Sequence, residues 1–183
     1  MAKKSKNQKK KKQKKKLRKK SGANSNKSFS TLNSNVDDQY ERIYKILGIE
    51  MREDEGDDVN AIVNDENLEK FLKHLKGEIT FPIIITGIED MGCFGWEEYY
   101  NFGLGNKAEY EKLKKKYPSF RDKYELLSFI DEFDEEEGIY VEAQRISDKK
   151  TFTLTLADLK SVEKNTNNSI LLDDYAVWYT NFR

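Results

Sequence analysis

The sequence has little of several residue types on which common functions depend. Its 183 residues include one cysteine, one histidine and two prolines. The single Cys93 excludes an internal disulfide, and His74 lacks the neighbours that a nucleophilic triad or a zinc site needs. No apolar run approaches the roughly 18 residues that span a bilayer, and no apolar signal segment follows the basic N-terminus. We therefore expect a reduced, soluble, cytoplasmic protein with no membrane span and no known type of enzyme active site.

The charges are balanced in number but separated along the chain. Basic and acidic residues number 33 each, yet residues 1–27 hold 14 Lys and Arg and no acid. The remaining residues hold 19 basic and 33 acidic side chains, a net charge of −14. A basic arm on an acidic body predicts different partners for the two parts.

Composition divides the chain into three parts. Residues 1–34 are expected to be a disordered Lys-rich tail and linker, because they show no apolar period. Residues 35–66 form a peripheral helix and an acidic loop, and residues 67–183 form the main domain. The tail is suited to nonspecific contact with nucleic acid or anionic membrane, but it has no aromatics for base stacking. A solubility or localisation tail, or a tail that folds back on the acidic body, remains an equal alternative.

Four segments have apolar residues at helical spacing. The expected helices are Val36–Leu47, ended by Gly48; Glu66–Lys76, capped by Asn64 or Asp65 and ended by Gly77; Lys107–Tyr117, ended by Pro118; and a C-terminal aromatic helix from about Ser169 to Phe182. In the last of these, Asp173 and Asp174 are expected in the first turn.

Other segments read as strands. Ile79–Ile88 is apolar and β-branched, with Pro82 marking either an edge strand or the strand's beginning. Three further strands follow in sequence and predict a meander, namely Lys123–Asp131, Ile139–Ile146 and Thr151–Leu156. Residues 89–106 have no clear period and receive no assignment. The fold class is therefore α+β, with an antiparallel sheet packed by helices.

Two motifs have a plain interpretation that fits better. Gly103, Gly105 and Ala108 match the spacing of a dinucleotide-binding fingerprint, but the strands that follow are joined by turns too short for parallel crossovers. A glycine-rich turn is the better interpretation. Cys93 has no second cysteine or nearby histidine, so we expect a small buried residue there.

Acidic pairs and runs are abundant, and the densest is the turn from Asp131 to Glu137. Exposed acidic runs do not supply the two different carboxyl environments of general acid and base catalysis. They can supply the oxygen ligands that Ca²⁺ prefers, although neither acidic turn has the spacing of an EF-hand loop. A plain solvated turn is the alternative. The predicted calcium ligands are Asp131, Asp134, Glu135, Glu136, Asp173 and Asp174.

From about Leu68 to Arg183 the order of segments carries a family resemblance. The segments are a helix leading into Phe81-Pro82, then strands, then Phe152–Leu159, and finally Leu172–Trp178. In these the chain resembles a bacterial family of small SH3-like proteins related to the cyanobacterial calcium-binding protein that regulates heterocyst differentiation. The resemblance implies a small SH3-like barrel and a link to calcium, and it does not reach residues 1–60.

Two functions from different classes follow. The first is a calcium-responsive or protein-interaction module built on the acidic body, with a regulatory role. The second is a nucleic-acid or ribosome-associated factor that acts through the Lys-rich tail. Deletion of residues 1–27 distinguishes them, because only the first function survives it.

Overall fold

The computed structural model describes residues 38–50, 57–89 and 92–183. The chain divides into two units, Met1–Glu41 and Arg42–Arg183. Of the first unit only residues 38–41 are described, and they are helical. The predicted tail and linker, residues 1–34, lie outside the described residues. In the described part of the chain, no helix is long and apolar enough to cross a membrane.

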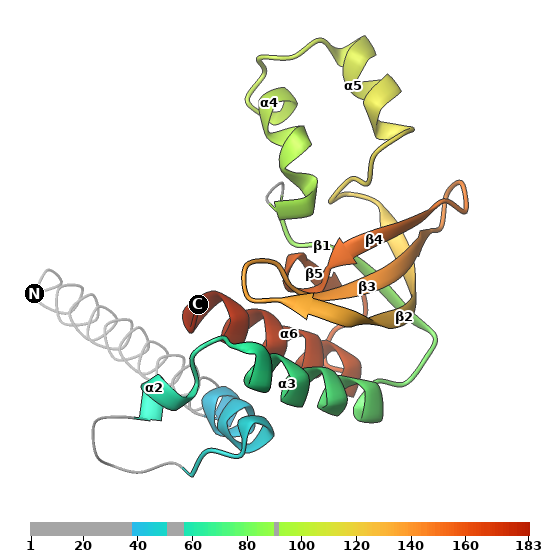
Figure 1. Ribbon diagram of the computed structural model, residues 1–183. Coiled ribbons are helices and arrows are strands. Elements are labelled where there is room, and N and C mark those ends of the chain that lie inside the picture. Colours follow the sequence, from blue (N-terminus) through green and yellow to red (C-terminus); the bar gives the residue numbers. More distant parts are fainter. Residues whose placement is uncertain (1–37, 51–56, 90–91) are drawn as a thin grey trace, which may run out of the picture. The chain divides into compact units, whose positions relative to one another are not determined.

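The second unit combines helices with a sheet, as the α+β prediction required (Figure 1). Its helices are α2 (Asp57–Asn60), α3 (Asp65–Glu78), α4 (Glu98–Asn101), α5 (Lys107–Lys114) and α6 (Asn167–Asn181), together with the 3₁₀ turns η1 (Gly92–Glu97) and η2 (Leu156–Asp158). Residues 38–47 are also helical, and Gly48 follows them with a φ of 72°. Gly48 thus ends this helix as predicted, because glycine adopts the left-handed region at little cost.

The sheet is antiparallel and open, in the order β4-β3-β2-β1-β5. Its strands are β1 (Ile83–Gly87), β2 (Lys123–Asp134), β3 (Gly138–Arg145), β4 (Thr151–Thr155) and β5 (Leu159–Ser161). Strands β2, β3 and β4 follow one another as neighbours, which confirms the predicted meander. The barrel closure of an SH3-like fold stays a prediction.

The core lies where α3 and α6 pack side by side on one face of the sheet (Figure 1). Trp178 of α6 is fully buried, and its ring stacks on Phe71 of α3 at 4.5 Å between centroids. Its indole N–H donates to the carbonyl oxygen of Ala61 at 2.7 Å. Below the sheet, the Tyr175 hydroxyl accepts the backbone N–H of Ile139 at 2.8 Å, so the helix is bonded directly to β3. The aromatic stripe read from the sequence is therefore the centre of the core.

Several helix and strand boundaries differ from the prediction. Helix α6 begins at Asn167, because Thr166 and Ser169 form a reciprocal capping box. The expectation that Asp173 and Asp174 lie in the first turn was therefore wrong. Helix α3 continues through Gly77 to Glu78, so Gly77 does not end it.

The first strand is also shorter than expected. It starts directly after Pro82 and lies between β2 and β5, so the proline marks its beginning rather than a sheet edge. Residues that had received no assignment form η1 and α4.

Candidate functional site

The turn between β2 and β3 is held by the carboxylate of Asp134. Its Oδ1 accepts the backbone N–H groups of Glu136 at 2.9 Å and Glu137 at 2.6 Å. Its Oδ2 accepts the Tyr140 hydroxyl at 2.8 Å. The bond from the Glu137 backbone, followed by the one from Tyr140, holds the pKa of Asp134 below its ordinary value. Asp134 is thus ionised and used to fix the turn.

Helix α6 supports the same turn from below. Gly138 has a φ of 78°, and a Cβ built there would overlap the Tyr175 hydroxyl and the Tyr179 ring. The Tyr179 hydroxyl donates to the carbonyl oxygen of Glu135 at 3.2 Å. Only glycine combines this conformation with so close an approach. The hairpin tip is therefore held against the aromatic face of α6, while the side chains of Glu135, Glu136 and Glu137 stay exposed.

The other predicted calcium ligands have partners of their own. Asp131 is ion-paired with Lys76 at the end of α3. Asp174 is buried, and its two oxygens accept from Arg42 Nε at 2.7 Å and Nη2 at 2.8 Å. Asp173 is exposed, but partial desolvation of its carboxyl group, followed by the negative charge of Asp174, raises its pKa. The hairpin contacts α6 through Tyr175 and Tyr179. The neighbouring Asp174 is instead bonded to Arg42.

The predicted ligands are therefore not gathered around one point. Within residues 38–50, 57–89 and 92–183, no group of three or more His, Cys, Asp or Glu side chains is arranged to hold a metal ion. What the hairpin offers is a fixed tip with outward carboxylates rather than a closed cage of ligands.

A buried carboxylate was missed by the sequence analysis. Glu97 belongs to one of the acidic pairs and is fully buried, while its neighbour Glu98 is exposed. Its Oε1 accepts the hydroxyls of Tyr110 at 2.7 Å and Ser119 at 2.8 Å, and its Oε2 accepts the Phe120 backbone N–H at 2.9 Å. Burial and the bond to Glu97 raise the pKa of Tyr110 to about 12. Glu97 therefore joins η1 to α5 and to the segment before β2.

The lone cysteine and histidine have unremarkable surroundings. Cys93 is half-buried, and burial together with the nearby Asp158 charge raises the pKa of its thiol to about 12. An un-ionised thiol is a poor nucleophile. The residue is half-buried rather than buried as expected. His74 is half-buried on α3 rather than fully on the surface.

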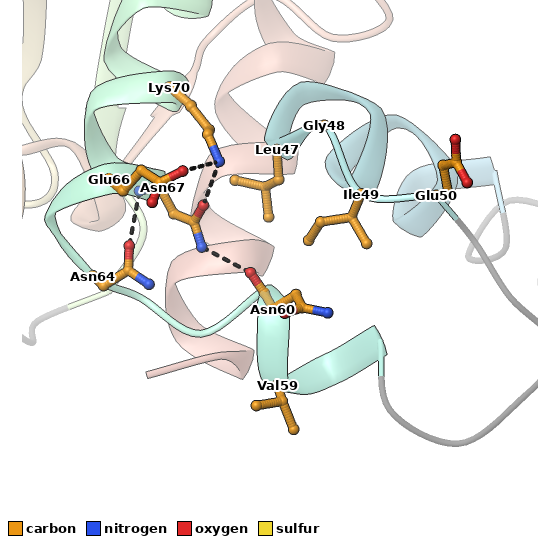
Figure 2. Close-up of a pocket in the computed structure, with 10 residues that line it drawn as sticks. All are labelled: Leu47, Gly48, Ile49, Glu50, Val59, Asn60, Asn64, Glu66, Asn67 and Lys70. Carbon is orange, nitrogen blue, oxygen red and sulfur yellow. Dashed lines mark hydrogen bonds and ion pairs between the residues drawn. The ribbon is translucent and has the colours of Figure 1, made fainter.

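A hollow of about 700 Å³ lies between Gly48 and the start of α3 (Figure 2). Figure 2 shows that its polar side chains engage one another. Asn67 donates to the carbonyl oxygens of Asn60 and Ile62, and its own oxygen accepts from Lys70, which pairs with Glu66 at 2.8 Å. Because these polar groups are bonded to one another, we interpret the hollow as a structural feature of the fold.

Comparisons with known proteins add two structural likenesses. No protein-family model matches the sequence, and no curated protein does. One similar solved structure is a calcium binding protein in its calcium-binding form, with 15% identity and a TM-score of 0.47, covering 79% of this chain and 90% of that one. Another is CcbP of Anabaena, with 15% identity and a TM-score of 0.40, covering 70% and 94%. Likeness at this level assigns neither a ligand nor a partner to this chain.

Proposed function

We propose that the Arg42–Arg183 unit is a non-enzymatic acidic binding module that takes up Ca²⁺ at the tip of the β2–β3 hairpin and serves a regulatory role in the cytoplasm. The observation that carries this proposal is the fixed turn. Asp134 holds the backbone of Glu136 and Glu137, and Tyr179 holds that of Glu135, so three glutamate side chains face solvent from a defined backbone. The SH3-like character of the sheet belongs to the same proposal, supported by the meander and by the pairing of β5 with β1.

Electrostatics explains why this tip favours a divalent cation. Residues 131–137 hold six carboxylates, of which Asp131 has Lys76 as a nearby cation. The exposed glutamates repel one another, and a doubly charged ion relieves that repulsion. Ca²⁺ suits them better than Mg²⁺, because it accepts six to eight oxygens in a flexible arrangement.

The predicted ligands contribute unequally in this proposal. Glu135 and Glu136 are exposed and are the main ligands, together with Glu137. Asp134 adds its charge while it maintains the turn, and Asp131 joins only by leaving Lys76. Asp173 and Asp174 stay secondary, since Asp174 is bonded to Arg42. A site of this openness binds at about 10⁻⁴ to 10⁻³ M.

The same surface suits a basic segment of a partner protein, which is how a regulatory role would be exerted. Exposed carboxylates attract Lys and Arg side chains and speed encounter more than they add affinity. Ca²⁺ and such a partner would compete for the same glutamates.

The test is calorimetric titration of the full chain with Ca²⁺ in near-physiological salt. The test variant carries Glu135, Glu136 and Glu137 as Gln, which removes the charges and leaves the Asp134 turn intact. A matched control carries Glu98, Glu109 and Glu111 as Gln, an equal change of charge at other exposed positions. We expect saturable heat from the wild type and the control and none from the test variant. Equal binding by the test variant would refute the assignment.

A further inference from the structure

A second surface lies in the insertion between β1 and β2. Three large apolar side chains of this insertion stand out into solvent: Tyr99 is 54% exposed, Phe102 73% and Leu104 68%. Several large exposed apolar side chains so close together in sequence favour a binding surface, because exposed apolar residues are usually scattered singly.

One of the exposed rings, Tyr99, belongs to a cluster of packed aromatic rings. Trp96 lies 5.6 Å from Tyr110 in a stacked arrangement and 6.1 Å from Tyr100, and Tyr99 meets Tyr100 edge to face at 5.3 Å. The indole N–H of Trp96 donates to the Pro118 carbonyl oxygen at 2.6 Å. These contacts fix the positions of the rings, which form a platform of Trp96, Tyr99, Tyr100 and Tyr110. A planar ligand can therefore stack on the platform at little entropic cost.

A hollow of about 310 Å³ opens beside this platform. Its lining residues are Tyr100, Asn101, Gly105, Lys107, Tyr110, Glu111 and Arg121. A Cβ at Gly105 would overlap the Tyr100 ring, so the glycine lets the loop close directly over that ring. The volume is at the lower end of those that hold small ligands and is of the order needed for one base.

The C-terminal part of the insertion is basic, whereas the unit as a whole is acidic. Residues 107–121 contain six Lys and Arg and two Glu, whereas residues 28–183 as a whole carry a net charge of −14. The side chains of Lys107, Lys112, Lys115, Lys116 and Arg121 are exposed. A polyanion is therefore repelled by most of the unit and attracted to residues 107–121.

We propose that the β1–β2 insertion binds single-stranded nucleic acid. Bases stack on Tyr99 and Phe102, and the exposed cations, with Lys107 and Arg121 at the hollow, take the phosphates. Aromatic rings beside a basic groove are the combination by which proteins hold unpaired strands with little sequence preference. An apolar protein partner would explain the exposed rings but would leave the basic charge unused.

The experiment uses the full chain and two fluorescein-labelled probes, an oligothymidylate of about 12 nucleotides and an abasic strand of the same length. Fluorescence anisotropy in near-physiological salt gives the two affinities. The Lys-rich residues 3–20 attract both phosphate backbones alike, so the ratio of the two affinities isolates base stacking. We expect the wild type to prefer the oligothymidylate.

The test variant combines Tyr99→Ala with Phe102→Ala, and the matched control is Phe81→Ala, a phenylalanine before β1 that is 44% exposed. In the test variant we expect affinity for the oligothymidylate to fall about tenfold and affinity for the abasic strand to stay unchanged. The control should leave both affinities at wild-type values, and thermal melts verify that each variant is folded. Equal wild-type affinity for the two probes would overturn the proposal, as would full oligothymidylate binding by the test variant. A change of oligomeric state on removal of the rings, without loss of oligothymidylate binding, would assign the surface to a second copy of the chain and also overturn it.

Discussion

The guanidinium of Arg145 in β3 donates a 2.8 Å hydrogen bond to the carbonyl oxygen of Lys114, the last residue of α5. It also donates to the carbonyl oxygens of Lys115 and Tyr117. The last carbonyl groups of a helix have no partner within it, and a cation nearby also complements the helix dipole. One buried arginine of the sheet thus fixes the end of the helix that carries the basic side chains of the insertion.

Arg145→Met should destabilise the domain by roughly 3 to 5 kcal/mol, the usual cost of breaking a buried charge network by removing one partner. The substitution removes the Arg145 donor from the three carbonyl oxygens, from Asp122 and from Asp148. Urea denaturation followed by circular dichroism measures the change. Lys123→Met, at an exposed position of β2, should shift stability by no more than about 0.5 kcal/mol. Equal effects from the two substitutions would contradict the role given to Arg145.

The Arg145–Asp148 pair also predicts a pH dependence. Hydrogen bonding to Arg145 lowers the pKa of Asp148 to about 2. Because the unfolded chain has the higher pKa, about 3.9, the pair's stabilisation is complete above that value and is lost as the pH falls towards about 2. Denaturation midpoints measured across this window should fall more steeply for the wild type than for Asp148→Asn. Glu163→Gln, an exposed acid elsewhere, should retain the wild-type slope.

Trp178→Ala should cost roughly 3 to 5 kcal/mol, the range for a buried large aromatic truncated to alanine. Trp178→Phe keeps a ring to stack on Phe71 and loses the hydrogen bond to Ala61, so it should cost about 1 to 2 kcal/mol. Chemical denaturation of both variants tests the order of the two effects. A midpoint unchanged by the alanine substitution would show that this face is not the core.

Glu97 should tolerate an amide better than an apolar side chain. In Glu97→Gln the amide oxygen can still accept from the Phe120 backbone while the amide nitrogen faces two hydroxyls, which can reorient to accept. We expect a loss of about 1 kcal/mol for Gln and more than about 3 kcal/mol for Leu, which strands three donors. Thermal melts compare the two variants. A leucine variant as stable as the glutamine variant would rule out a structural role for the buried carboxylate.

Local signals in the sequence predicted most of the architecture. Gly48 follows its helix as predicted, and Asn64 caps α3 by accepting the Asn67 N–H. The short connections between strands predicted the β2–β3–β4 meander. These features depend on neighbours within a few residues, so periodicity and caps reveal them. The start of α6 was missed because Thr166 and Ser169 were not recognised as a capping box.

The site depends on contacts that sequence spacing does not reveal. Arg42 is hydrogen-bonded to Asp174, which lies 132 positions away in the sequence. Lys76 is bonded to Asp131, which lies 55 positions away. Both pairings turn predicted ligands into members of ion pairs. The burial of Glu97 arises in the same way, from donors in segments more than ten residues distant. A run of acids therefore identified the hairpin but not the side chains that remain available in it.

The central claim is that Ca²⁺ binds at the hairpin tip, and amide chemical-shift mapping tests it most directly. The full chain, labelled with ¹⁵N, is titrated with CaCl₂ in near-physiological salt, with MgCl₂ as the comparison. The claim predicts saturable shifts centred on the amides of Glu136, Glu137 and Ile139, where the Asp134 and Tyr175 bonds report any change in the turn, and weaker shifts with Mg²⁺. Shifts that do not saturate, or that centre on residues away from the hairpin, would contradict it.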